Sequence, residues 1–150
     1  MPKENSKYRF LFIQPFELPT GGAFADKYHS AELSKEKRLR MEYLNIKDLL
    51  ADVEWDFHGG PVAPYGDWAV ETREEFAHVA AARLPIVREA CESGKYNAIV
   101  LLGGGEPGFM SSREIARKYG IPVTSCAFSQ MHIASMLGNK FSIIDFTEVH

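Results

Sequence analysis

Cysteine is scarce in this chain of 150 residues, which has only Cys91 and Cys126. The two cysteines show neither the spacing of a metal site nor that of a disulfide framework, so we expect no bound metal. No apolar stretch approaches the roughly 18 residues that a membrane span requires. The first residues also lack the apolar core of a signal peptide. We therefore expect a cytoplasmic protein with no membrane partner.

The chain has no large excess of charge of either sign. Its 17 Lys and Arg against 20 Asp and Glu leave a net charge of -3, which gives no bulk attraction to nucleic acid or an anionic membrane. Internal repeats and low-complexity segments are absent as well. What remains is the composition of a globular protein, with 45% hydrophobic and 25% charged residues. The length corresponds to one domain.

The most informative stretch covers residues 97–110. Residues 98–102 form an unbroken apolar run, typical of a strand that is covered on both faces in a parallel sheet. The run leads into three glycines, and Ser111 then precedes Glu114 by three residues, which is the pattern of a capping box. We predict a central strand, a glycine turn and a helix that starts at Ser111. The three glycines are Gly103, Gly104 and Gly105.

A glycine turn between a strand and a helix is a common anion site of α/β proteins, because backbone N–H groups and the helix dipole point to the ligand. A tight turn without a ligand is the alternative. The glycines from Gly103 to Gly108 also match the dinucleotide fingerprint literally. Pro107 stiffens this turn, however, and no acidic residue ends the next strand to hold a ribose. We therefore reject a dinucleotide site and expect no cofactor.

The remaining segments alternate between strand and helix patterns. This order predicts an α/β fold: a doubly wound parallel sheet of four to five strands flanked by helices, a Rossmann-like or flavodoxin-like three-layer sandwich. The acids that alternate along residues 52–57 suit a strand at the sheet edge. The expected strands are residues 8–13, 52–57, 121–126 and 141–146 beside the central one, and the further expected helices are residues 30–50, 69–93 and 128–137.

Three side chains are expected beside the glycine turn, because the carboxyl ends of parallel strands share one edge. Gln14 follows the first strand, and its amide suits a carboxylate or amide ligand or, equally, a hydrogen bond within the loop. Ser125 and Cys126 end the fourth strand. For Cys126 two interpretations stay open, an acid/base role and packing in the core.

Four further residues have a less specific pattern. Cys91 falls on the apolar stripe of the long helix and is expected in the core. His132 is expected to be a hydrogen-bonded core residue rather than a base. Tyr65 and Trp68 lie in a loop rich in glycine and proline, where they are candidates to contact a ligand or to pack.

The chain resembles the aspartate/glutamate/hydantoin racemase superfamily over nearly its whole length. Most of the matching motifs are typical of the fold more than of the chemistry. They are Phe12-Ile-Gln-Pro15, Gly60-Pro61, Ala98-Ile-Val, Glu106-Pro-Gly-Phe, Arg113-Glu-Ile, Ile121-Pro-Val, the stretch Met131-His-Ile-Ala-Ser-Met-Leu-Gly138, and Phe141-Ser-Ile-Ile.

The resemblance implies a two-domain enzyme without a cofactor, in which two cysteines face each other across a cleft. One removes a proton from the substrate carbon and the other returns it on the opposite face. This chain has Gly103 in place of the first cysteine, and Gln14-Pro15 where hydantoin racemases have Asn-Pro. The second cysteine would belong to a second domain that begins near Phe141. Arylmalonate decarboxylases, which resemble racemases, also have glycine at the first position.

We therefore expect residues 1–140 to form an N-terminal racemase-like α/β domain and residues 141–150 to be the first strand of a missing or abbreviated second domain. The predicted function is binding of a small carboxylate or amide compound at the carboxyl edge of the sheet. Gln14, Ser125 and the three glycines of the turn would contact it. A decarboxylase-like enzyme that acts on one face and a non-catalytic binding or regulatory domain are the alternatives, with a flavodoxin-like nucleotide binder as a weaker one. The apolar segment 141–146 predicts a homodimer or a higher oligomer.

Overall fold

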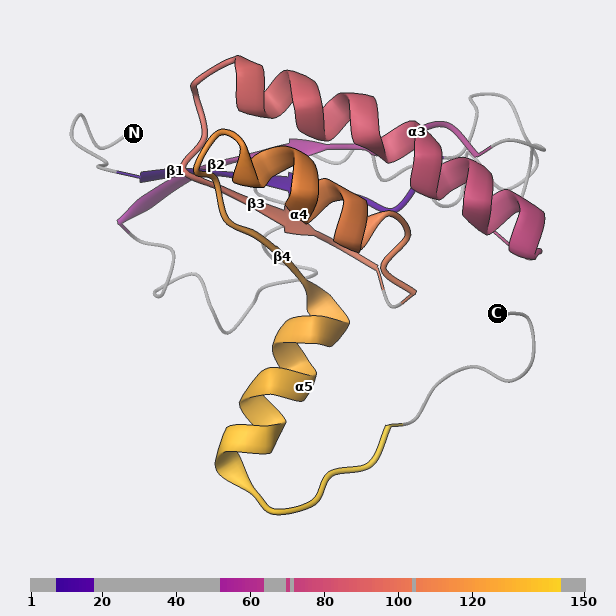
Figure 1. Cartoon of the computed structure of the whole chain (residues 1–150), viewed down its shortest axis with the longest axis vertical. Helices are drawn as coiled ribbons and strands as arrows, with labels where there is room; N and C mark the ends of the chain where they lie inside the picture. Colours follow the sequence, from indigo (N-terminus) through magenta and orange to yellow (C-terminus); the bar gives the residue numbers. More distant parts are fainter. Residues whose placement is uncertain (1–7, 18–51, 64–69, 71, 104, 144–150) are drawn as a thin grey trace.

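Four parallel strands form the sheet, in the order β2-β1-β3-β4 (Figure 1). The structure is a computed structural model that describes residues 8–17, 52–63, 70, 72–103 and 105–143. With helices after β2, β3 and β4, it confirms the predicted α/β class with Rossmann-like architecture. The strands are β1 (Tyr8–Ile13), β2 (Val53–His58), β3 (Ala98–Leu101) and β4 (Val123–Ser125).

Strand β1 lies inside the sheet and is apolar on both faces, as expected for a strand that is covered from both sides. Leu11 and Ile13 are almost completely buried against the two helices α3 and α4. Phe12 points to the opposite face, where it packs with Trp55 and Leu102. Among the four described strands, β2 is the outermost on one side of the sheet, so for this part of the chain the prediction that the acidic strand lies at an edge is confirmed.

Helix α3 (Arg73–Glu92) begins with a capping box that the sequence analysis missed. The Thr72 hydroxyl accepts a hydrogen bond from the Glu75 N–H at 3.1 Å, and the Glu75 carboxylate accepts one from the Thr72 N–H at 2.8 Å. The predicted helix of residues 69–93 is therefore confirmed, with a later start. Cys91 is buried on its inner face, as predicted.

Helix α4 (Phe109–Arg117) packs beside α3 over the same face of the sheet (Figure 1). The predicted capping box at Ser111 is wrong, because the helix begins two residues earlier after Gly108, whose φ of 74° turns the chain. At its other end, the helix is closed by a glycine. Gly120 has a φ of 69°, and the Gly120 and Ile121 N–H groups bond back to helix carbonyls in a Schellman pattern.

Helix α5 (Cys126–Leu137) leaves the carboxyl end of β4 and runs away from the sheet (Figure 1). The predicted boundary was wrong: Cys126 is the first residue of this helix and does not belong to the strand. None of the residues of α5 is buried, and Met136 and Leu137 are 70% and 83% exposed. His132, which was expected in the core, is exposed, and its ring stacks on the Phe128 ring. A helix that is apolar on every side suggests burial, but in the described part of the chain only its first turn is packed.

Several predictions fall partly or wholly outside the described residues. Residues 141–143 are exposed and not part of a strand, and residues 144–146 are outside the described ranges. The predicted helix of residues 30–50 is outside them too, as are Tyr65, Trp68 and Gly104. None of the helices in the described ranges combines the length and the apolar composition that a membrane span needs.

Candidate functional site

The turns that follow β1 and β3 touch each other at the carboxyl edge of the sheet. The Leu102 N–H donates to the Ile13 carbonyl at 2.8 Å, and the half-buried Gln14 N–H donates to the His58 carbonyl of β2 at 3.0 Å. Pro15 of the first turn packs against Gly103 of the second. The predicted residues Gln14 and Gly103 therefore lie in adjacent turns.

A buried arginine, Arg83 of α3, lies beneath this edge and is completely shielded from solvent. Its guanidinium donates to three backbone carbonyls, those of Ile13 at 2.8 Å, Pro107 at 3.1 Å and Leu102 at 3.2 Å. The hydrogen bonds of one side chain thus connect the end of β1, the end of β3 and the glycine turn. Arg83 was not predicted to belong to the site, although a charged residue on the apolar stripe of α3 was a usable signal.

The positive charge of Arg83 has no carboxylate beside it among the described residues. Burial lowers the pKa of Arg83 to about 10, because a low-dielectric surrounding disfavours the charged form. Among the described residues, the titratable group that acts against this shift is the Cys126 thiol, which lies within electrostatic reach. The Nε atom of Arg83 is buried without a hydrogen-bond partner. The edge of the sheet thus contains a cation that no carboxylate in the described part of the chain neutralises.

The glycine turn is shaped by its contacts with the rest of the protein. Gly103 has a φ of 107°, a left-handed conformation that residues with a side chain rarely adopt. A Cβ atom at this position would lie 3.0 Å from the Pro15 ring, so the cysteine expected from the family resemblance would be strained here. At Gly105 an added Cβ would lie 2.9 Å from the Phe76 ring of α3, so this glycine allows the turn to approach the helix. Gly104 is outside the described residues.

Glu106 connects the glycine turn to α5. It is the one non-glycine residue with positive φ in the described ranges, at 52°. Its Oε1 atom accepts hydrogen bonds from the Ser125 hydroxyl and from the Phe128 N–H, the latter at 2.6 Å. A carboxylate at a helix N-terminus is stabilised by the helix dipole and by donation from the first-turn amides. The protein thus supplies its own anion at the start of α5.

This internal carboxylate narrows the space for a ligand. Ser125 is 1% exposed and already donates to Glu106, so its proposed contact with a ligand stays a prediction. A ligand carboxylate at this edge would bind on the side of Gln14 and Gly103, because Glu106 occupies the N-terminus of α5. Glu106 itself was missed, because its role depends on a backbone conformation that the sequence does not indicate.

Cys126 is the first residue of α5 and is half-buried. It lies at the positive end of the helix dipole and within electrostatic reach of the Arg83 cation, with the Glu106 carboxylate at the same helix end. Cys126 is therefore the thiol of the described residues that the fold brings to the carboxyl edge, whereas Cys91 is buried in α3.

The described residues contain no group of three or more His, Cys, Asp or Glu that could hold a metal ion. Comparison with protein-family models, with curated proteins and with solved structures finds no match to this chain. The geometry of the edge is therefore the basis on which a function is argued.

Proposed function

We propose that this chain is a protein of the aspartate/glutamate/hydantoin racemase superfamily that binds a small carboxylate or amide compound at the carboxyl edge of its sheet, without a cofactor. One observation carries the proposal: Arg83 places a buried cation, which no described carboxylate neutralises, directly beneath the turns that hold Gln14 and Gly103. An anion bound at these turns gains an electrostatic interaction that is strong because the surrounding dielectric is low.

Isothermal titration calorimetry with malonate tests the binding. We expect the Gln14→Leu variant to bind malonate at least about 10-fold more weakly, which corresponds to about 1.4 kcal/mol, because it keeps the volume of the side chain but loses the amide. The control is Gln130→Leu on the exposed face of α5, which should leave the affinity unchanged. The absence of binding to the wild-type chain, or equal affinities of the wild type and the Gln14→Leu variant, would contradict the proposal.

A second candidate function is that of a decarboxylase that acts on one face: the C–C bond to a carboxylate of the bound compound would break, CO2 would leave, and Cys126 would protonate the resulting carbanion. It is favoured by the position of this thiol at the start of α5, within electrostatic reach of Arg83. The thiol would donate its proton to the substrate carbon, and water would then protonate the resulting thiolate. Because Gly103 provides no second thiol, such an enzyme would not racemise its substrate. A single-enantiomer aspartate or hydantoin should therefore keep its optical rotation.

The rate of alkylation of Cys126 by iodoacetamide, with and without malonate, distinguishes the second candidate from a non-catalytic binding domain. For proton transfer we expect slower labelling when malonate is present, because the thiol must lie beside the bound carboxylate. The Cys126→Ser variant is the control, since only the buried Cys91 remains in it. Labelling that malonate does not slow would remove this candidate and leave the binding function.

A further inference from the structure

Helix α5 presents an apolar surface that the other described elements leave exposed. Its 12 residues include no Asp, Glu, Lys or Arg, and none of them is buried. A helix at the surface of a protein normally has a charged face, whereas charged residues are depleted in the core of a protein interface. The composition of α5 is therefore that of a helix in an interface. Its large side chains that are more than a third exposed are Phe128, Met131, Ile133, Met136 and Leu137.

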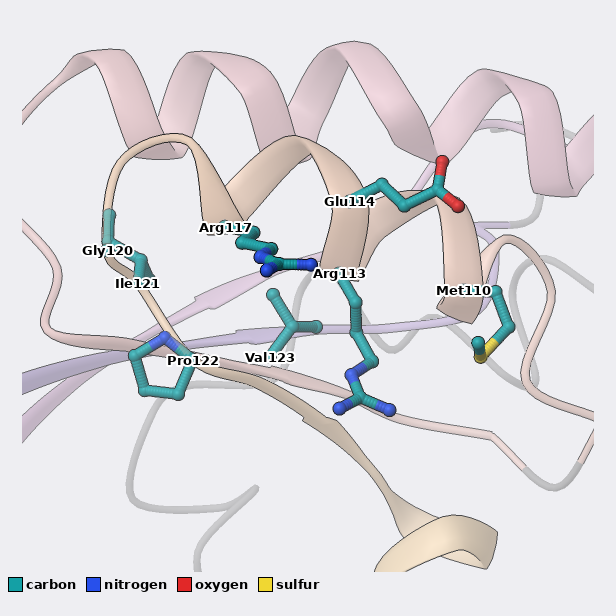
Figure 2. Close-up of a pocket in the computed structure, with 8 residues that line it drawn as sticks. All are labelled: Met110, Arg113, Glu114, Arg117, Gly120, Ile121, Pro122 and Val123. Carbon is teal, nitrogen blue, oxygen red and sulfur yellow. The ribbon is translucent and has the colours of Figure 1, made fainter.

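A groove of about 630 Å³ lies between α4 and β4. Figure 2 shows α4 above and Pro122 and Val123 below, with Met110 towards one end of the groove. Arg113, Glu114 and Arg117 contribute charged side chains of both signs to its lining. The apolar residues among those that line the groove are Met110, Ile121, Pro122 and Val123.

The position of this groove in the fold is the one that a helix would occupy. Successive right-handed crossovers that step in one direction place their helices side by side on the same face of a parallel sheet. After β3, α4 and β4, the next helix would therefore lie beside α4 and over β4, where the groove is. The following helix in the chain is α5, but it runs away from the sheet (Figure 1).

Contacts at its first turn direct α5 away from the groove of its own chain. The Phe128 N–H donates to the Glu106 carboxylate at 2.6 Å, and the Phe128 ring lies 5.2 Å from the Phe109 ring of α4. The guanidinium of Arg113, which lines the groove, is 5.3 Å from the centre of the Phe128 ring. The chain thus has an exposed apolar helix and a groove that suits a helix, and its own contacts keep the two apart.

We propose that two copies of this chain exchange their α5 helices, so that α5 of each copy lies in the groove between α4 and β4 of the other. Such an exchange gives a closed dimer with two-fold symmetry, because each copy provides one helix and one groove. It requires no pairing of opposite charges. It involves neither Gln14 nor Gly103 and is independent of the ligand binding proposed above.

The area of the contact favours a reciprocal exchange over a single contact. With about 180 Å² for a fully exposed large apolar residue, the exposed fractions of the five α5 side chains correspond to about 500 Å². One helix in one groove thus buries about 1,000 Å² in total, which is below the standard size of a stable interface. Two such contacts bury about 2,000 Å², which reaches that size.

Sedimentation velocity of the full chain between 5 and 200 µM tests the association. We expect the average mass to rise with concentration to that of a dimer and no further. The association should be as strong in 500 mM NaCl as in 20 mM NaCl, because salt screens charges but not apolar contacts. A chain that stays monomeric at 200 µM, as it would if its own residues covered α5, or one that forms larger assemblies, would overturn the proposal.

Substitutions on the helix and in the groove test whether these two surfaces form the contact. Met136 of α5 is 70% exposed and Met110 of the groove is 64% exposed, so the monomer tolerates a charge at either position. We expect Met136→Lys and Met110→Glu each to weaken dimerisation at least 10-fold, because the contact would bury the introduced charge. Val62→Glu, at a residue that is 60% exposed and outside both surfaces, is the control and should dimerise like the wild type. If Met110→Glu dimerises like the wild type, the groove does not hold α5 and the proposal is wrong.

A mixture of the two variants tests the exchange itself. In a mixed dimer, one contact has neither substitution, and the other brings the introduced lysine and glutamate into the same groove. We therefore expect the equimolar mixture to dimerise at least 10-fold more tightly than either variant alone. If the mixture is no tighter, although both variants show a native circular dichroism spectrum, the helix of one copy does not lie in the groove of the other.

Discussion

Replacing Arg83 by methionine should destabilise the fold by about 3 kcal/mol, a large share of the stability of a single domain. Methionine has a similar length and fits a buried position, but it has no hydrogen-bond donor. The carbonyls of Ile13, Leu102 and Pro107 would all lose their bond to the guanidinium. The substitution therefore tests whether one buried cation holds the carboxyl edge together.

Two opposing effects decide the size of the loss. Burial lowers the pKa of Arg83 from 12.5 to about 10, so keeping the charge inside costs about 3 kcal/mol, which the variant no longer bears. Against this, each bond from a charged donor contributes roughly 1.5–3 kcal/mol, and three such bonds are lost. The loss of the three hydrogen bonds outweighs the saved cost of burying the charge. In the variant the three carbonyls stay buried without the Arg83 donors, and an unsatisfied buried acceptor is costly.

The free energy of unfolding of both variants in urea, followed by circular dichroism, provides the measurement. The control is Arg88→Met, one turn further along α3 and exposed, which should change stability by no more than about 0.5 kcal/mol. If Arg83→Met loses less than about 1 kcal/mol relative to this control, the three hydrogen bonds do not carry the stability that we assign to them.

Three further predictions concern α5, the glycine turn and alkaline pH. Glu106→Ala should lower the free energy of unfolding by about 1–2 kcal/mol and speed hydrogen exchange at the Phe128 amide. The effect of Glu106→Gln should be smaller, because glutamine keeps a hydrogen-bond acceptor. Equal exchange rates at Phe128 in the wild type and Glu106→Ala would show that Glu106 does not cap α5. Gly103→Ala should lower the stability in thermal unfolding by about 1–3 kcal/mol. The loss should be larger than for Gly94→Ala, since Gly94 also has positive φ but has no atom within 4 Å of the added Cβ. A larger loss for Gly94→Ala would contradict the close approach of Pro15 to residue 103. Burial raises the pKa of Cys91 above its ordinary value of 9.0, so the thiol of the unfolded chain ionises first and the free energy of unfolding should fall as the pH rises through 9. This fall should be less steep in the Cys91→Ala variant. Equal pH dependence of the two proteins would show that Cys91 does not cause it.

The sheet could be predicted from the sequence because each strand has a simple pattern. The apolar run of β3 and the alternation in β2 are local properties, and their positions were correct to within one residue. The start of α4 was wrong because Ser111 and Glu114 match a capping box, yet Gly108 already turns the chain into the helix. The same pattern at Thr72 and Glu75 forms a real capping box. A pattern of two residues does not specify which of several matches becomes a helix end.

The candidate site was predictable only in part. The positions of Gln14 and Ser125 followed from the rule that parallel strands end at one edge. Arg83 was missed because an arginine on an amphipathic helix normally lies in solvent, and its burial depends on three carbonyls from distant parts of the chain. Glu106 was missed for a similar reason, since its carboxylate reaches α5 only from a left-handed backbone conformation.

The attachment of α5 by one end has a mechanical consequence. The Glu106 carboxylate fastens the first turn of this helix to the glycine turn, and none of its residues is buried. A helix of 12 residues is about 18 Å long. A tilt of about 5° at its base, from a small shift of the glycine turn, therefore moves its far end by about 1.5 Å. A displacement at the carboxyl edge that tilts α5 would therefore give a larger displacement at the exposed end of this helix.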